Sequence, residues 1–334
     1  MQGLIKDYVV KYLGGSGAEV PLEALDDSAV IDDIVIKSDS HTVKPLFFPG
    51  GDIGRLAVTG TVNDIAVMGA DPLALSSGFI IEEGFLLEDF ERILKSMHEA
   101  CQEAEVYVLT GDTKVMEKGA LDKLVINTSG IGRRNSELDE NLEEVRRHRR
   151  LESRWLLDSN LAPGDRIIIS GTIGDHGIAV LSSREGYGFE TDVKSDVAPL
   201  NRLVKEMLKV GGVVKVKDPT RGGLANTLNE WSEKSRVGIA VHEGSIPIKT
   251  GVRVACEMLG IDPLEVGNEG KLVIASIPEK AEEILKVLRN FPIGKDANII
   301  GEASGEFREV VLQTAVGGRR IMLPPIGDPV PRIC

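Results

Sequence analysis

Short apolar runs alternate along the chain with segments in which apolar residues recur every three or four positions, a pattern typical of mixed strands and helices. Segment 86–104 predicts a long amphipathic helix with Phe90, Ile93 and Met97 on one face. Helical spacing also marks 59–70. Strands are predicted at 26–32, 33–40, 73–84, 105–113 (a short run stopped by a glycine) and 123–132.

A second unit of similar size repeats this alternation. Its predicted strands are 165–170, 237–244, 271–277, 297–304 and 308–315, and its predicted helices are 175–185, 195–210, 250–260 and 278–291. The pattern indicates an α+β protein with domains at 1–157 and 158–320 and a tail at 321–334.

A charged stretch, 135–159, connects the two units. Apolar positions recur there at helical spacing, and Glu143 precedes Arg146 and Arg147 in the orientation that favours helical ion pairs. We interpret it as a solvated connecting helix. The alternative, a basic docking patch at 146–150, is diluted by the acidic residues beside it.

The tail has no regular pattern and contains Pro324, Pro325, Pro329 and Pro331. Proline removes a backbone donor and fixes φ, which excludes a helix interior or a central strand. We therefore expect a mobile, extended arm that could carry the last residue about 35 Å at roughly 3.1 Å per residue.

Composition narrows the class of protein. The chain has 334 residues, a length that favours two domains, and a net charge of −13, which argues against a nucleic-acid surface. No apolar stretch approaches the run of about 20 residues that spans a membrane, and the start lacks the features of a signal peptide. We expect a cytoplasmic protein.

The three cysteines are widely spaced, which excludes a disulfide framework and a cysteine-rich zinc site. Cys101 and Cys256 lie in helical patterns and are interpreted as core residues. Cys334, the last residue of the sequence, has no such explanation, and a prenylation signal would need a cysteine fourth from the end.

Neither a P-loop nor a dinucleotide fingerprint is present. The first half instead places aspartates at turns and strand ends, and carboxylates of this kind bind magnesium and bridge it to phosphates. Asn63 and Asp64 interrupt an apolar helix, where a polar side chain costs free energy unless it is hydrogen-bonded or paired. Asp112 and Lys114 place a carboxylate that could bind metal near an ammonium that could bind phosphate. The aspartates considered are Asp26, Asp27, Asp39, Asp52, Asp64 and Asp112.

The second half supplies anion-binding geometry, because glycine turns at Gly174–Gly177 and Gly222–Gly223 each lead into a helix and Arg221 stands beside one of them. These glycines could equally be simple helix caps. His176 is a catalytic candidate or a neighbour of a cap. Glu269 lies in a glycine-flanked turn as an exposed or metal-facing carboxylate.

Several stretches, in order and nearly end to end, resemble the HypE family of [NiFe]-hydrogenase maturation proteins, within the PurM-like (aminoimidazole ribonucleotide synthetase) superfamily. They are FFPGGDIGRLAVTGTVNDIAVMGADPLALSSGFIIEEGF, TGDTKV, INTSGIG, SGTIGDHGIAVLSSREG, DPTRGGLANTLNE, NEGK and PRIC. The aspartates and glycine turns would also suit selenophosphate synthetase or thiamine-phosphate kinase. The terminal PRIC narrows the choice to the HypE family, because those relatives do not end in a cysteine that carries the substrate. The sequence departs from the family pattern in two places. LDDSAV lacks the glycine that usually precedes the aspartates, and the charged segment 135–159 is longer than the family pattern has between the two units.

The resemblance implies a PurM-like fold that forms a homodimer and an ATP-dependent carbamoyl dehydratase whose tail carries the substrate. A carbamoyltransferase, HypF, would place a carboxamide on Cys334, ATP with Mg²⁺ would drive its dehydration to a thiocyanate, and the HypC–HypD complex would accept the cyanide for iron. Rival hypotheses are a small-molecule kinase or synthetase of the same superfamily, with an inert tail, and a non-catalytic scaffold.

The resemblance also implies residue roles. Asp27, Asp39, Asp64 and Asp112 would bind magnesium and nucleotide, with Asn63 beside them. Lys114 would contact phosphates and take part in catalysis, and Arg221, Gly174 and Gly222 would face the phosphate end. Glu269 and His176 are candidates for proton removal.

Overall fold

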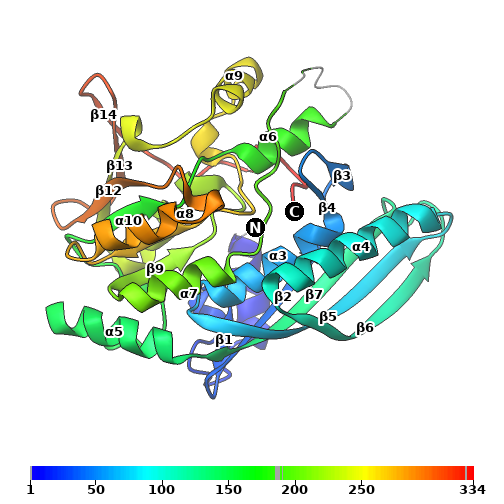
Figure 1. Ribbon diagram of the computed structural model, residues 1–334, viewed down its shortest axis with the longest axis horizontal. Helices are drawn as coiled ribbons and strands as arrows, with labels where there is room; N and C mark the ends of the chain where they lie inside the picture. The colour runs from blue at the N-terminus through cyan, green and yellow to red at the C-terminus, as the bar shows by residue number, and fades with distance from the viewer. Residues whose placement is uncertain (1, 185–188, 190, 328) are drawn as a thin grey trace.

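The computed structural model describes residues 2–184, 189, 191–327 and 329–334, and it contains two α+β units (Figure 1). The first unit is built on a five-stranded sheet in the order β1-β2-β7-β5-β6. Its strands are β1 (Ala29–Ile31), β2 (Ile34–His41), β5 (Ala70–Glu82), β6 (Tyr107–Met116) and β7 (Leu124–Arg134). β5 and β6 are parallel, and the other neighbours are antiparallel.

Helices α3 (Ile53–Ala66) and α4 (Leu87–Ala104) cover one face of this sheet (Figure 1). α3 is almost wholly buried, and Asp52 caps its first turn by accepting hydrogen bonds from the amides of Gly54 and Arg55. The small ribbon of β3 (Phe47–Phe48) and β4 (Gly51–Asp52) precedes α3. β2 and α3 therefore hold their polar side chains in fixed positions.

The second unit has a seven-stranded sheet in the order β14-β13-β10-β12-β8-β11-β9. Its strands are β8 (Arg166–Ile169), β9 (Val213–Lys217), β10 (Gly238–His242), β11 (Val273–Ser276), β12 (Asn298–Ser304), β13 (Val310–Gln313) and β14 (Arg319–Ile321). Ile168 packs with the helices on one face, while Ile167 and Ile169 pack on the other. This alternation follows the two-residue period of a strand.

Helices cover both faces of the second sheet. α7 (Asn201–Val210), α10 (Ala281–Arg289) and α5 (Ser136–His148) share one core cluster with it, and α8 (Gly223–Ser235) belongs to the other. α6 (Asp175–Ser182) and α9 (Thr250–Leu259) pack instead with residues of α3 and α4, in a cluster that joins the two units.

The α+β architecture predicted from the sequence is confirmed, and several details differ. β6 runs through Gly111 to Met116 because it pairs with β5 along its whole length. The helix predicted from residue 195 begins only at Asn201, and β14 (Arg319–Ile321) is a strand that the pattern did not predict, ending at the first residue of the predicted tail. α5 is not fully solvated, since Leu138, Leu142 and Val145 are completely buried.

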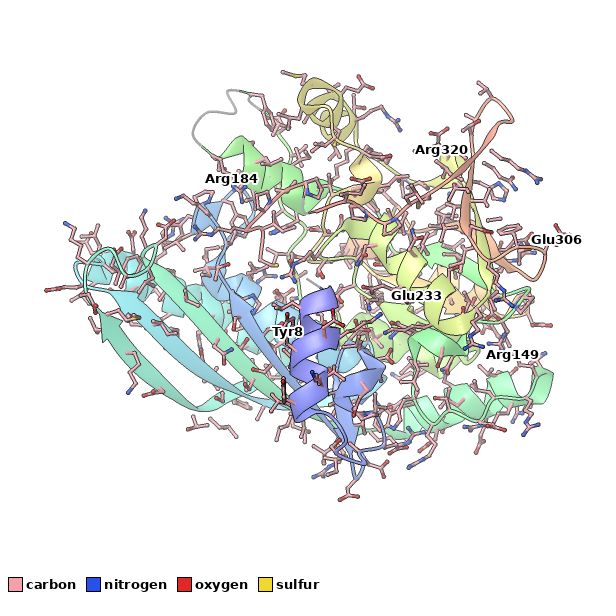
Figure 2. The ribbon with its side chains drawn as sticks, turned by 180° about the vertical axis from the view of Figure 1, so that it is seen from behind. Tyr8, Arg149, Arg184, Glu233, Glu306 and Arg320 are labelled. Carbon is pink, nitrogen blue, oxygen red and sulfur yellow. The ribbon has the colours of Figure 1, made fainter. Side chains whose placement is uncertain are left out.

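At the N-terminus, helical turns span residues 2–13, and Figure 2 shows this segment from behind, with Tyr8 on it. Lys6 Nζ lies 3.6 Å from Glu233 Oε1 at the end of α8. Among the described residues, no helix combines the length and the apolar character needed to cross a membrane.

Candidate functional site

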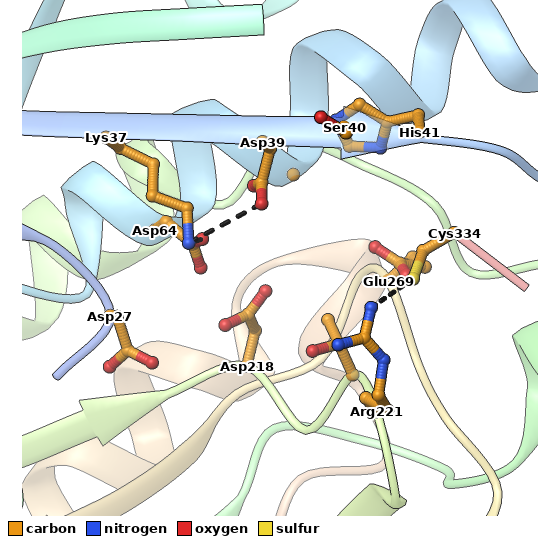
Figure 3. Close-up of a pocket in the computed structure, with 12 residues that line it drawn as sticks. Asp27, Lys37, Asp39, Ser40, His41, Asp64, Asp218, Arg221, Glu269 and Cys334 are labelled. Atoms are coloured by element: carbon orange, nitrogen blue, oxygen red, sulfur yellow. Dashed lines mark hydrogen bonds and ion pairs between the residues drawn. The ribbon is translucent and has the colours of Figure 1, made fainter. Parts of the chain in front are cut away.

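A cavity of about 180 Å³ lies where both units meet the end of the chain (Figure 3). This is smaller than the roughly 300–1,000 Å³ of most small-molecule sites, so a ligand of ordinary size would extend beyond the cavity. Its lining comes from the loop before β1, from β2 and α3, from the turn after β9, from the loop before β11 and from the chain end. The lining residues are Asp27, Lys37, Asp39, Ser40, His41, Gly60, Asp64, Asp218, Thr220, Arg221, Glu269 and Cys334.

Strand β2 directs three functional side chains to the cavity, because Lys37, Asp39 and His41 alternate along it and so share a face. Lys37 forms an ion pair with Asp64, and its Nζ lies 3.5 Å from Asp39 Oδ1. Burial alone would lower the pKa of Lys37, but Asp64 and Asp39 raise it above its usual value. Lys37 therefore remains a charged ammonium in the cavity.

His41 is buried, and its Nε2 lies 3.4 Å from Thr128 Oγ1. Its Nδ1 has no hydrogen-bond partner among the described residues. Burial lowers the pKa of His41 to about 4, so the ring is neutral at physiological pH. It offers the cavity an uncharged, uncommitted ring nitrogen.

Three carboxylates converge on the cavity, since oxygens of Asp27, Asp64 and Asp218 lie within 4.8 Å of one another. One Asp218 oxygen is buried without a hydrogen-bond partner in the described part of the chain. Burial and then the charge of Asp27 raise the pKa of Asp218 to about 6, and burial raises the pKa of Asp64 although Lys37 opposes it. Carboxylates this close favour a cation, and their oxygens suit a hard divalent ion such as Mg²⁺.

Two lysines on β9 form ion pairs with Asp27 and hold it in place. Lys215 is completely buried on β9, with its Nζ 2.9 Å from Asp27, 3.4 Å from Asp26 and 3.1 Å from Asp158. Lys217 Nζ lies 3.1 Å from the other Asp27 oxygen. Burial alone would raise the pKa of Asp27, but Lys215 and Lys217 hold it below its usual value. Asp27 is thus held ionised, by residues distant in sequence.

We expect Lys215→Met to lower the free energy of unfolding by about 3–5 kcal/mol, because it leaves buried carboxylates without their counter-ion. Equilibrium denaturation in urea measures the change. The matched control is Lys205→Met, which breaks a surface pair with Asp71 and is expected to cost less than about 1 kcal/mol. Equal losses in both variants would contradict the role of the buried cluster.

The thiol of Cys334 lies at one end of the cavity, beside Arg221 and Glu269 (Figure 3). Arg221 Nη2 is 3.7 Å from Cys334 Sγ. Burial and the neighbouring Glu269 raise the pKa of Cys334 to about 12, although Arg221 opposes the shift. In this position the unmodified side chain is a neutral thiol.

Glu269 is 2% exposed, and its Oε1 has no hydrogen-bond partner among the residues that the structure describes. Burial, followed by the charges of Asp218 and Asp196, raises the pKa of Glu269 well above its usual value. A buried carboxyl of this kind is a strong base once it loses its proton. The cavity therefore combines a thiol, a base, two cationic side chains and a carboxylate cluster.

The predicted residues divide into two groups. Asp27, Asp39, Asp64, Arg221, Glu269 and Cys334 meet at the cavity, as does the previously unassigned Asp218. Asn63 does not reach it: the amide accepts from Leu200 N at 2.8 Å and donates to the backbone oxygens of Ala198 and Glu269. These partners in the second unit satisfy the hydrogen-bonding groups of the Asn63 amide, which is buried in an apolar helix.

Asp112 and Lys114 also lie outside this chain's cavity. Both are on β6, where they pair in register with Gly78 and Ile80 of β5, and both side chains are 72% exposed. Their charged groups lie 3.6 Å apart. The structure therefore does not bring them to the other acidic residues within a single chain.

The glycine turns act as helix starts in the structure. Gly174 and Gly222 are the residues before α6 and α8, with φ of 81° and 77°, which only glycine adopts readily. Neither lines the cavity. His176, in the first turn of α6, is fully buried away from it and contacts the tail instead.

Sequence reasoning missed Lys37, His41, Asp218 and the lysines on β9. A signal for the first two was available, since KSDSH is a run of polar residues at the end of the strand predicted at 33–40, and every second residue of a strand points to the same face. Asp218 directly precedes the turn that carries Arg221. Nothing local distinguishes Lys215 from a surface lysine.

Comparison with known proteins places these features in a family. Residues 25–134 match the N-terminal domain of AIR synthase related proteins, and residues 162–313 match their C-terminal domain. The carbamoyl dehydratase HypE of Bradyrhizobium diazoefficiens is 48% identical over 304 residues, covering 90% of this chain and 83% of that protein.

Solved structures agree. The crystal structure of a HypE–HypF complex contains a chain that is 45% identical, with a TM-score of 0.86 over 96% of this chain and 99% of that one. HypE in complex with ATP is 42% identical, with a TM-score of 0.82 over 100% and 96%. Thiamine monophosphate kinase from Aquifex aeolicus is 17% identical with a TM-score of 0.63 over 95% and 97%, a likeness of fold alone.

Proposed function

The chain belongs to the HypE family of AIR-synthase-related proteins, and from this we propose that it is an ATP-dependent carbamoyl dehydratase whose substrate is carried on its own Cys334. The observation that carries the proposal is the position of the thiol, which lies in a carboxylate-lined cavity beside Glu269 and Arg221. The product, a thiocyanate on Cys334, supplies cyanide for the iron of [NiFe]-hydrogenase. Because the reaction consumes ATP, we place it in the cytoplasm.

The chemistry begins with a carboxamide, S–C(=O)–NH₂, on Cys334. The amide oxygen attacks the γ-phosphorus of ATP and ADP leaves, which converts the oxygen into a leaving group. The C–O bond then breaks to release phosphate, and the two N–H protons depart as the S–C≡N group forms. Glu269, in its ionised form, accepts one of these protons at its unpartnered carboxylate, and the departing phosphate takes the other. Arg221 and Lys37 offset negative charge at the phosphate end.

Mg²⁺ fits the carboxylate cluster of Asp27, Asp64 and Asp218, with Asp39 next to it across Lys37. When bound, it would neutralise charge on the phosphates. The protein's own part is to hold Asp27 ionised through Lys215 and Lys217. Glu269 is buried and Cys334 is half-buried, so the protein limits the access of water to the amide.

HypF is proposed as the carbamoyl donor, because the related HypE chain was crystallised with HypF. The HypC–HypD complex is proposed as the cyanide acceptor. Loading by HypF requires the thiol to leave the cavity, since a docked thiol with a pKa near 12 is not a nucleophile. The expected mobility of the tail serves this exchange.

The test is intact-mass spectrometry in two steps. The chain is incubated with HypF, carbamoyl phosphate and only as much ATP as the loading reaction consumes, desalted, and divided into portions with and without fresh MgATP. We expect a carbamoyl adduct on Cys334 that loses the mass of one water only with MgATP. An unmodified Cys334 after the first step would refute the proposal, as would a loaded tail that MgATP leaves unchanged, which is the outcome a scaffold predicts.

We also propose a homodimer formed through β6. All ten residues of this edge strand are exposed, including Tyr107, Leu109 and Val115 at 73%, 72% and 69%. An apolar, unpaired edge of this length favours pairing with another chain. Dimerisation would bring Asp112 and Lys114 towards the partner's cavity, where the family resemblance assigns them a role.

Leu109→Asp is therefore expected to convert the dimer to monomers and to abolish dehydration of a loaded tail, because a charge would be buried at the interface. Light scattering coupled to gel filtration measures the mass. Leu87→Asp, which places the same charge at an exposed leucine of α4, serves as the control and should remain dimeric. A monomeric Leu109→Asp variant with full activity would contradict the shared site.

A further inference from the structure

His176 occupies a position that neither the cavity nor the proposed chemistry explains. It lies in the first turn of α6, is completely buried, and packs edge-on against Phe48 with ring centroids 5.3 Å apart. Its Nε2 lies 2.7 Å from the backbone oxygen of Ile333, and its Nδ1 lies 2.8 Å from Ser195 Oγ. The two residues that it bridges are far apart in the sequence.

The hydrogen-bond partners determine which nitrogen of His176 carries the proton. A backbone oxygen only accepts, so Nε2 donates to Ile333. Burial lowers the pKa of His176, although Asp196 opposes the shift, and the ring is therefore neutral with an unprotonated Nδ1. Ser195 Oγ accepts from Val197 N at 3.1 Å and donates its own hydrogen to that Nδ1. This chain of bonds fixes the ring with its donor aimed at the tail.

Other contacts with the tail are more exposed. Arg184 Nη2 donates to the backbone oxygens of Pro331 and Arg332, at 2.6 and 2.7 Å, in solvent. Thr42 N donates to the backbone oxygen of Cys334 at 3.0 Å. The bond from His176 is buried, where a hydrogen bond is stronger and a lost partner costs more than at the surface.

The side chain of Ile333 completes the attachment. It is 2% exposed within the cluster that joins the two units, together with Val330. Gly267 makes room for it, because a Cβ on that glycine would lie 2.5 Å from Ile333 Cδ1. Ile333 immediately precedes Cys334, so its carbonyl and side chain together set where the thiol lies.

We propose that His176 is a positioning residue that clasps the tail in its docked state through the Ile333 carbonyl and so delivers the Cys334 side chain to Glu269 and Arg221. The proposal rests on the proposed function for its consequence in catalysis, while the clasp itself is independent of it. His176 touches no reacting atom in this arrangement. The clasp has to form for dehydration and to open when partners load or unload the thiol.

Alkylation of Cys334 by iodoacetamide, followed by intact-mass spectrometry and peptide mapping, tests the clasp without any partner. The docked thiol is half-buried and neutral, so it reacts slowly and the rate rises with the fraction of tail that is undocked. We expect His176→Leu to raise the rate about tenfold, as the loss of one buried hydrogen bond implies. His176→Gln, whose amide can still donate to the Ile333 carbonyl, should restore a rate near that of the wild type.

Two further variants keep the test decisive. His242→Leu, at an exposed histidine that ends β10, should alkylate at the wild-type rate. If His176→Leu does not fold, His176→Asn replaces it, because its shorter amide stops short of the tail. The proposal would be overturned if a folded variant that lacks the Nε2 donor of His176 is alkylated no faster than the wild type.

Only one of the two half-reactions should respond to the loss of the clasp. In His176→Leu, ATP-driven dehydration of a loaded tail should slow about tenfold, while carbamoylation by HypF should not slow, because only the first needs a docked tail. Equal slowing of both would overturn the clasp in favour of a merely structural role. If no variant and no wild type forms a cyanate, the proposed function fails, and the alkylation rates still decide the clasp.

Discussion

Replacing Cys334 with serine is expected to abolish both carbamoylation and cyanate formation. The nucleophile in such a transfer is a thiolate, and a serine hydroxyl does not ionise comparably at neutral pH. Serine preserves the shape of the docked tail, including the backbone bonds to Thr42 and the packing of Ile333. Intact mass after incubation with HypF, carbamoyl phosphate and ATP measures the loss, which should be complete.

The other two cysteines provide matched controls for this prediction. Cys101 on α4 and Cys256 on α9 are buried in the core that joins the units. Burial raises the pKa of both, that of Cys256 to about 12. Cys101→Ser and Cys256→Ser should therefore retain the adduct. An adduct on the Cys334→Ser variant would show that the substrate is carried elsewhere and would contradict the proposed function.

Periodicity predicted most of the fold because helices and strands are local. The amphipathic pattern of 86–104 became α4 almost residue for residue. Failures occurred where tertiary contacts overruled local signals. Pairing with β5 carries β6 past Gly111, and packing against the second unit buries the apolar face of α5. Neither partner is visible from the segment alone.

The residues of the site likewise divide into those that the sequence reveals and those whose role depends on remote contacts. Aspartates at strand ends are visible in the sequence, and the resemblance to a family selected among them. Which of them stays ionised depends on Lys215, which is 188 positions from Asp27. The role of His176 depends on Ile333, which is similarly remote. The sequence alone could not show how side chains from such distant segments are placed next to one another.

Glu269 is where catalysis and stability are expected to conflict. The Glu269→Gln variant should lose dehydration of a loaded tail by about 10²–10⁴-fold, because the amide cannot accept the N–H proton. Loading of Cys334 by HypF should be retained, since it does not involve this carboxylate. Single-turnover mass spectrometry of the pre-loaded chain after addition of MgATP separates the two steps. Full dehydration by the variant would assign the base elsewhere, with His41 the next candidate from its unpartnered Nδ1.

The same substitution should not destabilise the protein at neutral pH. Burial, Asp218 and Asp196 raise the pKa of Glu269 in the folded state, so the unfolded chain ionises first as pH rises. The wild type therefore loses stability as pH rises above the unfolded pKa of glutamate, until the folded group also ionises. The amide in Glu269→Gln does not titrate, so thermal unfolding without magnesium should show the Tm of the variant, relative to wild type, increasing as pH rises above the unfolded pKa of glutamate. A difference that is constant with pH would mean that Glu269 is not strained by its surroundings, and the argument for a strong base there would lose its physical ground.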